Sequence, residues 1–311
     1  MKKYLLILLT GLLFISCDKD PDLEDHMLDS GLRFDQSVYE PEKFLVSYAN
    51  PNPTPAEAQR PVLIAIHGYS ASTFEWSEFR TWAGGRTDFA ISQVLMGGHG
   101  RSYQSFKEAT WKDWRQPIME EYERLEQAGY QNISFAGSST GCTLVLEMLA
   151  NGYFNNRIQP RHIFFVDPNI IASDKILSLV GVVGPIIGYT EAEHTAGEAQ
   201  YWYRFRPYET LKELRSLLNK VRKELQKGIT LPPNTSLKVY KAEKDDVTDP
   251  VGAVLIYKGV KTSDGKTVDI SMIPSNLHVF TRLEHREGTI TTQDGDNQQQ
   301  VFEDMATRLV R

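Results

Sequence analysis

The feature that most constrains the fold is a series of short apolar runs that alternate with helical patterns. Most runs are continuously hydrophobic, which is typical of parallel strands that are covered on both faces. The predicted strands are Phe44 to Tyr48, Val62 to Ile66, Ile91 to Leu95, Ile133 to Phe135, Ile163 to Val166, Leu237 to Tyr240 and His278 to Leu283. The predicted helices lie near Phe74 to Trp82, Trp111 to Gln127, Thr143 to Leu149, Val251 to Tyr257 and Gln298 to Leu309. This alternation predicts a doubly wound α/β sheet.

A long interruption of the alternation runs from about residue 169 to 233. It contains a strongly apolar stretch from Ile176 to Ile187 and ends at Pro232-Pro233. Between them, apolar residues follow helical spacing. These are Leu211, Leu214, Leu218, Val221 and Leu225. We predict a helical insertion between two strands of one domain that spans residues 33–311.

The N-terminus has the sequence pattern of a secretory signal. Lys2 and Lys3 precede an apolar run from Tyr4 to Ile15, which is too short to favour a membrane span. Cys17 directly follows Phe14-Ile15-Ser16, an arrangement that resembles a bacterial lipobox. That resemblance implies that residues 1–17 form a signal ending at Cys17, which is lipidated and anchors the protein to a membrane. A plain secretory signal with an incidental cysteine is the alternative.

Residues 18–32 begin with a charged stretch, from Asp18 to Asp25, that is too poor in apolar side chains to fold alone. We interpret it as an acidic tether between the lipid and the folded domain. Such an acidic start resembles that of lipoproteins displayed at the surface of some Gram-negative cells. The predicted location is therefore an exported, membrane-anchored one, at the outer membrane or cell surface.

The net charge and the cysteine content exclude several kinds of partner and cross-link. The net charge of -6, with no basic stripe, gives no electrostatic basis for binding nucleic acid. Only Cys17 and Cys142 are present, so a lipidated protein has one free thiol and no intrachain disulfide. The histidine spacings suggest no zinc site, and we predict neither a metal nor a cofactor. The sequence does not indicate an oligomeric state.

The stretch Gly137-Ser138-Ser139-Thr140-Gly141 satisfies the pattern G-x-S-x-G between a predicted strand and a predicted helix. In that context the pattern predicts a nucleophile elbow, a tight turn whose small neighbours let a strained serine expose its hydroxyl. Ser139 is the predicted nucleophile, because Ser138 lacks glycines at the two flanking positions.

A serine that attacks acyl groups also needs backbone donors for the oxyanion. The buried strand from Val62 to Ile66 ends in His67-Gly68-Tyr69, which supplies a suitable loop. We assign the two donors to the backbone N–H groups of Tyr69 and Thr140, and we expect His67 to brace the loop.

From Val62 to about Leu149 the chain resembles an α/β-hydrolase of the carboxylesterase and monoacylglycerol lipase branch. The resemblance rests on the His67-Gly68 loop, on Gly98-His99-Gly100-Arg101-Ser102 after the next strand, and on the elbow at Ser139. It implies a triad in the order serine, acid, histidine, an eight-stranded sheet, and a cap inserted after the sixth strand. The insertion at about 169–233 lies where that cap is expected.

The acid is expected after the strand from Leu237 to Tyr240. Asp245 is the predicted choice, by register with the family pattern. Asp246 is the neighbour most easily confused with it, and Asp167 occupies a position that some lipases use. Asp249 precedes Pro250 and is expected to cap the following helix.

The base is expected in a loop beyond the end of the last strand. His278 falls inside the predicted strand from His278 to Leu283, whereas His285 follows it. His285 is therefore the predicted general base, with His278 as the alternative.

These residues predict a serine hydrolase that cleaves carboxylic esters through an acyl-enzyme, without a cofactor. The apolar stretch from Ile176 to Ile187 favours small-molecule or lipid esters with an apolar portion. Amides, thioesters and acylated glycans remain alternatives, because the fold and the triad do not determine the leaving group. A binding lipoprotein on a catalytically silent hydrolase fold is the alternative from another class.

Overall fold

A computed structural model describes residues 20–23, 46–173 and 187–311 of the chain. The predicted signal segment with Cys17 lies outside the described residues. So do most of the predicted tether and nearly all of the apolar stretch between residues 176 and 187. The predictions for those segments therefore stay predictions.

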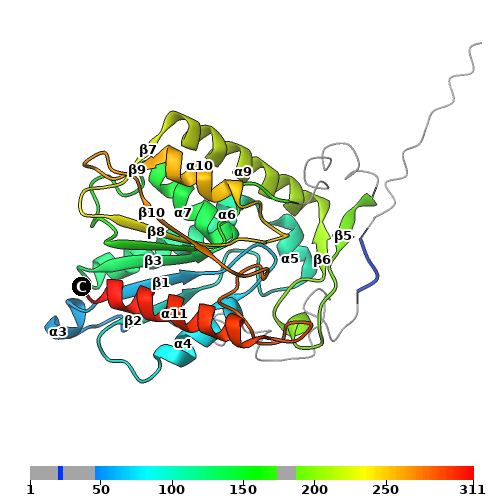
Figure 1. Cartoon of the computed structure of the whole chain (residues 1–311), viewed down its shortest axis with the longest axis horizontal. Coiled ribbons are helices and arrows are strands. Elements are labelled where there is room, and N and C mark those ends of the chain that lie inside the picture. Colours follow the sequence, from blue (N-terminus) through cyan, green and yellow to red (C-terminus); the bar gives the residue numbers. More distant parts are fainter. Residues whose placement is uncertain (1–19, 24–45, 174–186) are drawn as a thin grey trace, which may run out of the picture.

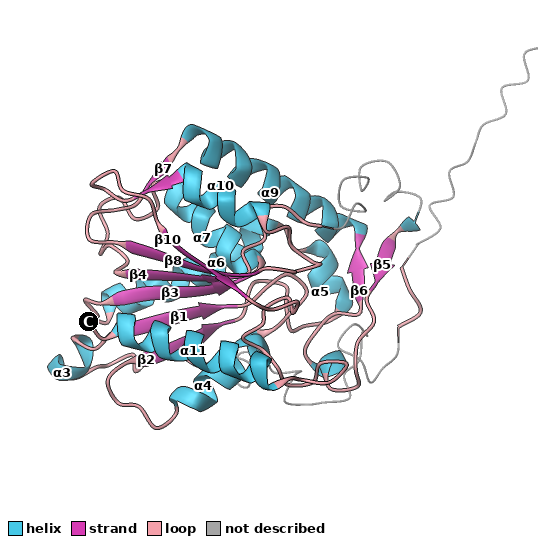
Figure 2. Ribbon diagram, in the orientation of Figure 1, coloured by secondary structure: helices cyan, strands magenta, loops and turns pink. Residues whose placement is uncertain are grey.

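A six-stranded sheet forms the centre of the described structure, with the strand order β10-β8-β4-β3-β1-β2 (Figures 1 and 2). Every neighbouring pair of strands is parallel. The strands are β1 (Val62–Ile66), β2 (Ala90–Val94), β3 (Ile133–Ser138), β4 (His162–Val166), β8 (Ser236–Ala242) and β10 (Asp269–Ile273). The resemblance implied eight strands, and the described residues contribute six to this sheet.

Five of the seven predicted strands coincide with strands of the sheet. In the predicted strand from Phe44 to Tyr48, the described part forms only an isolated bridge, from Ser47 to Gln93 of β2. The predicted strand from His278 to Leu283 is wrong, because those residues form turns. The last strand of the sheet is β10, which precedes them.

Helices cover both faces of the sheet, as Figure 1 shows. One layer contains α6 (Trp111–Gln127), α7 (Thr140–Ala150), α9 (Tyr208–Lys227) and α10 (Val251–Gly259), and the other contains α4 (Ser77–Ala83) and α11 (Thr292–Leu309). Strand β1 shows why both layers are needed. Its alternate residues Val62, Ile64 and Ile66 belong to the core with the first layer, and Leu63 and Ala65 to the core with the second. A strand buried on both faces is therefore apolar throughout.

The region from residue 169 to 233 runs between β4 and β8, as the sequence predicted. Its helix α9 buries the residues that were recognised by helical spacing and packs on α7 and α10. Before α9, β5 (Tyr189–Glu191) and β6 (Phe205–Pro207) form an antiparallel pair that lies beyond the ends of the central strands (Figure 2). The remaining short elements are α3 (Pro55–Ala58), η1 (Thr73–Trp76), α5 (Tyr103–Glu108), η2 (Glu198–Gln200), β7 (Ile229–Thr230) and β9 (Val260–Lys261). Whether the insertion acts as a cap stays a prediction.

Two features of the fold bear on function. The carboxyl ends of the parallel strands meet at one edge of the sheet, which is where α/β sheets position ligand sites. Among the described residues, no helix combines the length and the apolar character that a membrane crossing requires.

Candidate active site

Ser139 occupies the tight turn between β3 and α7. Its backbone has φ = +48°, a region that non-glycine residues rarely adopt and that indicates local strain. The main chain is held on both sides, because Ser139 N–H donates to the Val166 carbonyl at 3.0 Å and the Ser139 carbonyl accepts from Asn169 N–H at 3.1 Å. The turn presents the Ser139 hydroxyl to a cavity. Ser138 is fully buried instead, and its hydroxyl lies within hydrogen-bonding distance of two acceptors, the Ile66 carbonyl and the Glu75 carboxylate.

The two glycines of the G-x-S-x-G pattern are required by close approaches between backbones. A Cβ atom on Gly137 would lie 2.8 Å from the backbone nitrogen of Cys142 in α7. A Cβ atom on Gly141 would lie 2.6 Å from the Ile66 carbonyl oxygen in β1. The pattern therefore marks where a helix starts directly against two strands.

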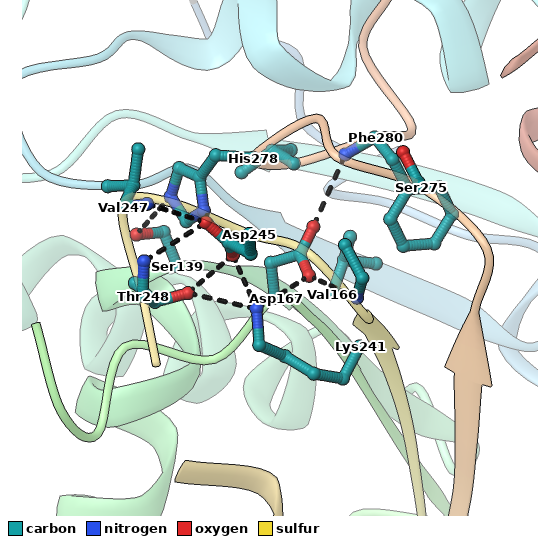
Figure 3. Close-up of polar contacts among 12 residues, drawn as sticks. Ser139, Val166, Asp167, Lys241, Asp245, Val247, Thr248, Ser275, His278 and Phe280 are labelled. Carbon is teal, nitrogen blue, oxygen red and sulfur yellow. Dashed lines mark hydrogen bonds and ion pairs between the residues drawn. The ribbon is translucent and has the colours of Figure 1, made fainter. Parts of the chain in front are cut away.

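The histidine that reaches Ser139 is His278, as Figure 3 shows. Its Nε2 lies 3.0 Å from Ser139 Oγ, and its Nδ1 lies 2.8 Å from Asp245 Oδ2. Serine, histidine and carboxylate thus form one hydrogen-bonded line. Of the residues predicted from the sequence, the structure brings Ser139 and Asp245 together.

The prediction of His285 as the base is wrong in its geometry. The His285 ring stacks with Phe74, with ring centroids 5.2 Å apart, and with Tyr201, at 6.3 Å. In the described part of the chain, it makes no hydrogen bond to Ser139 or Asp245. The error has a physical cause: since the last strand is β10, the first loop histidine beyond it is His278.

Asp245 is nearly enclosed by donors. Its Oδ1 accepts the N–H groups of Val247, at 2.8 Å, and Thr248, at 3.0 Å, and its Oδ2 accepts the Thr248 hydroxyl at 2.6 Å. Burial alone would raise the pKa of Asp245, but His278 and the Lys241 ammonium outweigh it and hold the pKa below its usual value. Asp245 is therefore ionised beside His278.

The two acids that follow Asp245 in the sequence, Asp246 and Asp249, have different surroundings. Asp246 is exposed. Asp249 accepts the Val251 N–H at 2.8 Å, but Pro250 occupies the N-cap position of α10, so the predicted cap by Asp249 is wrong by one residue.

Lys241, at the end of β8, is a fully buried cation that the sequence analysis missed. Its Nζ lies 2.5 Å from Asp245 Oδ2 and 3.2 Å from Asp167 Oδ1 (Figure 3). Asp167 also accepts N–H groups from Ala242, at 2.8 Å, and Phe280, at 3.3 Å, but makes no hydrogen bond to His278. Burial raises the pKa of Asp167, although Lys241 acts in the opposite direction. The sequence signal for Lys241 is a lysine at the end of a largely apolar strand.

The loop after β1 brings a second set of groups beside Ser139. A Cβ atom on Gly68 would lie 3.0 Å from the Cβ of Ser139. Gly68 N–H donates to the buried Glu75 carboxylate at 2.7 Å. Glu75 comes from η1, and no sequence signal marked it. Within the described residues, the N–H groups of Tyr69 and Thr140 donate to no acceptor.

His67 braces this loop, as predicted. Its Nε2 accepts the Met96 N–H at 3.0 Å, so its Nδ1 carries the proton and donates to the Gly68 carbonyl at 2.8 Å. Complete burial lowers the pKa of His67 to about 4. The ring is therefore neutral at pH 7 and holds one tautomer.

A cavity of about 280 Å³ adjoins Ser139 and His278. Trp202, Leu211 and Leu214 give it an apolar wall. The lining also includes three arginines and three glutamates: Arg206, Arg282, Arg286, Glu75, Glu193 and Glu198. Residues 201–205, before α9, include four aromatic residues, and of these only Trp202 lines the cavity; the others are Tyr201, Tyr203 and Phe205.

One group of described residues has the side chains and spacing of a metal site. The ligand atoms of Asp167, Asp245 and His278 all lie within 4.8 Å of one another. The Lys241 ammonium already binds both carboxylates, and His278 uses Nδ1 to reach Asp245. This donor set suits an internal ion pair better than a divalent cation, which would lie next to the ammonium.

Comparisons with known proteins agree with this architecture. No family model matches the sequence, and no curated protein matches it. Among solved structures, a structure from work on LipS and LipT, two metagenome-derived lipolytic enzymes, has a TM-score of 0.65 at 16% identity, over 85% of this chain and 96% of that one. A monoglyceride lipase of Saccharomyces cerevisiae gives a TM-score of 0.62 at 12% identity, over 85% and 89%. A monoacylglycerol lipase of Paleococcus ferrophilus gives 0.57 at 13% identity, over 80% and 96%.

These structures and the parallel sheet define the fold of the chain. The chain has the α/β-hydrolase fold, as predicted. At these identities the likeness shows the fold alone, so an activity has to be argued from the residues of the site.

Proposed function

We propose that this protein is a serine hydrolase that cleaves carboxylic esters through an acyl-enzyme. The observation that carries the proposal is the continuous hydrogen-bonded line from Ser139 through His278 to Asp245, beside two backbone donors without an acceptor in the described structure. The lipases and esterases among the solved structures of the same fold are consistent with this chemistry.

In the first half of the reaction, Ser139 Oγ attacks the ester carbonyl carbon while His278 Nε2 takes the hydroxyl proton. The carbonyl oxygen becomes an oxyanion, which the N–H groups of Tyr69 and Thr140 stabilise. The tetrahedral intermediate then breaks the bond to the alcohol oxygen, and His278 gives that oxygen the proton. The acyl group is left on Ser139.

In the second half, His278 takes a proton from water, and the oxygen of that water attacks the acyl carbon. The bond to Ser139 breaks, Ser139 recovers its proton from His278, and the carboxylic acid leaves. Asp245 accepts the hydrogen bond from Nδ1 throughout, which fixes the tautomer and stabilises the imidazolium in each transition state.

A fluorophosphonate probe tests the nucleophile. We expect it to label the wild-type protein and the Ser138→Ala variant, because Ser138 is fully buried and does not line the cavity. Labelling should be lost in Ser139→Ala. If Ser139→Ala is labelled as strongly as the wild type, or if the folded wild-type protein is not labelled, the proposal is wrong and the alternative of a silent binding protein gains.

The bond that is cleaved needs a separate test. We propose a carboxylic ester, with amides, thioesters and acylated glycans as the other substrates that the same groups can attack. Matched p-nitrophenyl esters, p-nitroanilides, thioesters and acetylated oligosaccharides distinguish them. The highest kcat/KM should belong to an ester with an apolar portion that contacts Trp202 and Leu211.

The location remains a proposal from the sequence. Lipid on Cys17 would attach the hydrolase to a membrane of an exporting bacterium, with the acidic tether between them. Metabolic labelling with a fatty-acid analogue should mark the wild-type protein but not a Cys17→Ala variant. Labelling of both would contradict this proposal.

A further inference from the structure

Six charged side chains line the cavity beside Ser139, and most of them have internal partners. Arg282 pairs with Glu198 at 2.8 Å, and its guanidinium carbon lies 4.5 Å from the centre of the Trp202 ring. The Glu75 carboxylate accepts the Gly68 N–H at 2.7 Å. These groups are therefore already used in holding the walls of the cavity.

Arg286 is also used internally. Its Nε donates to the Arg282 carbonyl at 2.5 Å, and one terminal nitrogen donates to the carbonyls of His278 and Val279, the latter at 2.8 Å. Burial lowers the pKa of Arg286 to about 10, so it still carries its charge at pH 7. These contacts make Arg286 a positioning residue for the loop that presents His278.

Arg206 differs from the other two arginines. Its side chain lines the cavity, yet within the described residues it has no hydrogen bond and no carboxylate oxygen within 4 Å, and its Nε is buried without a partner. Glu193, the other cavity charge without an ion pair in the described structure, is exposed. A partly buried guanidinium without a counter-charge is costly, which makes it a favourable place for an anion.

A second candidate donor to an anion, the Thr190 hydroxyl, lies beside Arg206 in the fold. Arg206 is the middle residue of β6, and Thr190 lies opposite it in β5. Residues opposite each other in an antiparallel pair point to the same face, and both of these residues line the cavity. A guanidinium fork and a neighbouring hydroxyl match the oxygens of a carboxylate or a phosphate.

We propose that Arg206, with Thr190, binds an anionic group of the ester that Ser139 attacks. This inference rests on the proposed function. The preferred substrate then has an apolar portion against Leu211 and Leu214 and a carboxylate or phosphate at Arg206. The apolar wall alone would accept any lipophilic ester. Arg206 is the residue that would distinguish an anionic ester from a neutral one.

The test compares anionic esters with neutral counterparts. The p-nitrophenyl monoester of adipate carries a carboxylate on the acyl side, and p-nitrophenyl 6-methylheptanoate replaces that carboxylate by an isopropyl group. On the alcohol side, 4-acetoxybenzoate is compared with its methyl ester, and 4-acetoxyphenyl phosphate with its neutral dimethyl ester. The kcat/KM of each pair is measured for wild type, Arg206→Met, Arg206→Lys and a control, Arg204→Met. Arg204 pairs with Glu191 and does not line the cavity.

We expect the wild type to prefer the anionic member of at least one pair. Arg206→Met should lower kcat/KM for that anion by about ten- to a hundredfold, with the neutral ester changed by less than about threefold. Arg206→Lys should keep part of the preference, and Arg204→Met should keep all of it. The responding pair tells whether the anion is a carboxylate or a phosphate and on which side of the ester it lies.

If fluorophosphonate still labels Ser139 and neutral esters are cleaved, but no anionic ester depends on Arg206, this inference is wrong and the proposed function stands. A uniform loss for anionic and neutral esters in a folded Arg206→Met variant also overturns it. If the wild type is neither labelled nor active on any ester, the proposed function and this inference fall together.

Discussion

At the scale of single residues, Lys241 is the side chain on which the arrangement of the acids depends most. It is fully buried between Asp167 and Asp245. Without its ammonium, two buried carboxylates would face each other within a few ångströms of His278, and one of them would have to take up a proton. A proton on Asp245 would weaken its hold on His278 Nδ1.

We therefore expect Lys241→Met to lower the free energy of unfolding by about 3–5 kcal/mol, as for other buried charges that lose a partner. It should also lower kcat/KM for a p-nitrophenyl ester by about tenfold or more. Urea denaturation and steady-state kinetics measure the two effects. Adding Asp167→Asn should recover much of the stability, because it removes one of the two opposed carboxylates.

Lys238→Met is the matched control in the same strand. Lys238 pairs at 2.9 Å with Asp269, whose side chain is 51% exposed. Lys238 is itself buried, but Asp269 stays hydrated and keeps its ion pair with Arg308 when Lys238 is replaced. This variant should therefore lose clearly less stability than Lys241→Met. Equal effects of Lys241→Met and Lys238→Met would contradict the role given to Lys241.

At the residue scale, the sequence was informative where chemistry imposes a local pattern. The elbow glycines identify Ser139 because backbones touch there, and the resemblance to the family pattern after the strand from Leu237 to Tyr240 indicates Asp245, with Asp246 and Asp167 as alternatives. The sequence was not informative where partners come from distant segments. Lys241 lies 74 residues from Asp167 along the chain, and only the folded sheet brings the two together.

At the scale of elements, the β3–α7 turn depends on how closely α7 approaches β1. Gly141 has no side chain because the carbonyl oxygens of Ile66 and His67 would lie 2.6 and 2.8 Å from its Cβ. Those carbonyls belong to the end of β1 and to the loop that follows it. Any side chain there must push α7 and Ser139 away from the loop.

Gly141→Ala should lower the free energy of unfolding by about 1–3 kcal/mol, as is usual for overpacking in a core. It should also reduce fluorophosphonate labelling of Ser139. Thermal and urea denaturation check the first effect, and labelling rates check the second.

The control is the same substitution at Gly295 in α11, where a Cβ would meet nothing within 4 Å. Gly295→Ala should raise stability by up to about 1 kcal/mol through helix propensity. If both substitutions stabilise the protein, the close approach at Gly141 is not a constraint.

The sequence did not reveal β10, and a strand was predicted from His278 to Leu283 instead. The choice of His285 as the base followed from that error. Among the described strands, β10 pairs only with β8, at the edge of the sheet, and four of its five residues are partly or fully exposed. It therefore lacks the continuous apolar pattern that identified β1, β3 and β4. The apolar residues Val279 and Phe280 lie in the following turn and are buried. Their sequence pattern therefore resembles that of a buried strand.

At the scale of the whole molecule, two buried histidines connect stability to pH. His67 and His99 are both fully enclosed, and burial is the main cause that lowers the pKa of each. The pKa of His67 falls from 6.5 to about 4. The unfolded chain therefore takes up protons at these sites between about pH 6.5 and pH 4, whereas the folded chain does not.

Acid therefore favours the unfolded chain. The contribution of these histidines to the free energy of unfolding should be fully present above about pH 6.5 and should fall as the pH drops toward 4. Each histidine contributes a slope of at most about 1.4 kcal/mol per pH unit. Urea denaturation at several pH values measures it.

His99→Phe should flatten that slope. The His99 ring packs among Phe106, Trp114 and Tyr203, so an apolar ring fits its surroundings. An unchanged slope in His99→Phe would show that His99 is not a source of the acid sensitivity.

The central claim is that His278, in line with Ser139 and Asp245, is the base of an ester hydrolase. The most direct test is kcat/KM for p-nitrophenyl butyrate in folded His278→Ala and His285→Ala variants. We predict a loss of about a thousandfold or more for His278→Ala and a change of a few fold for His285→Ala. A His278→Ala variant that keeps its activity, or a collapse of activity only in His285→Ala, would contradict the account.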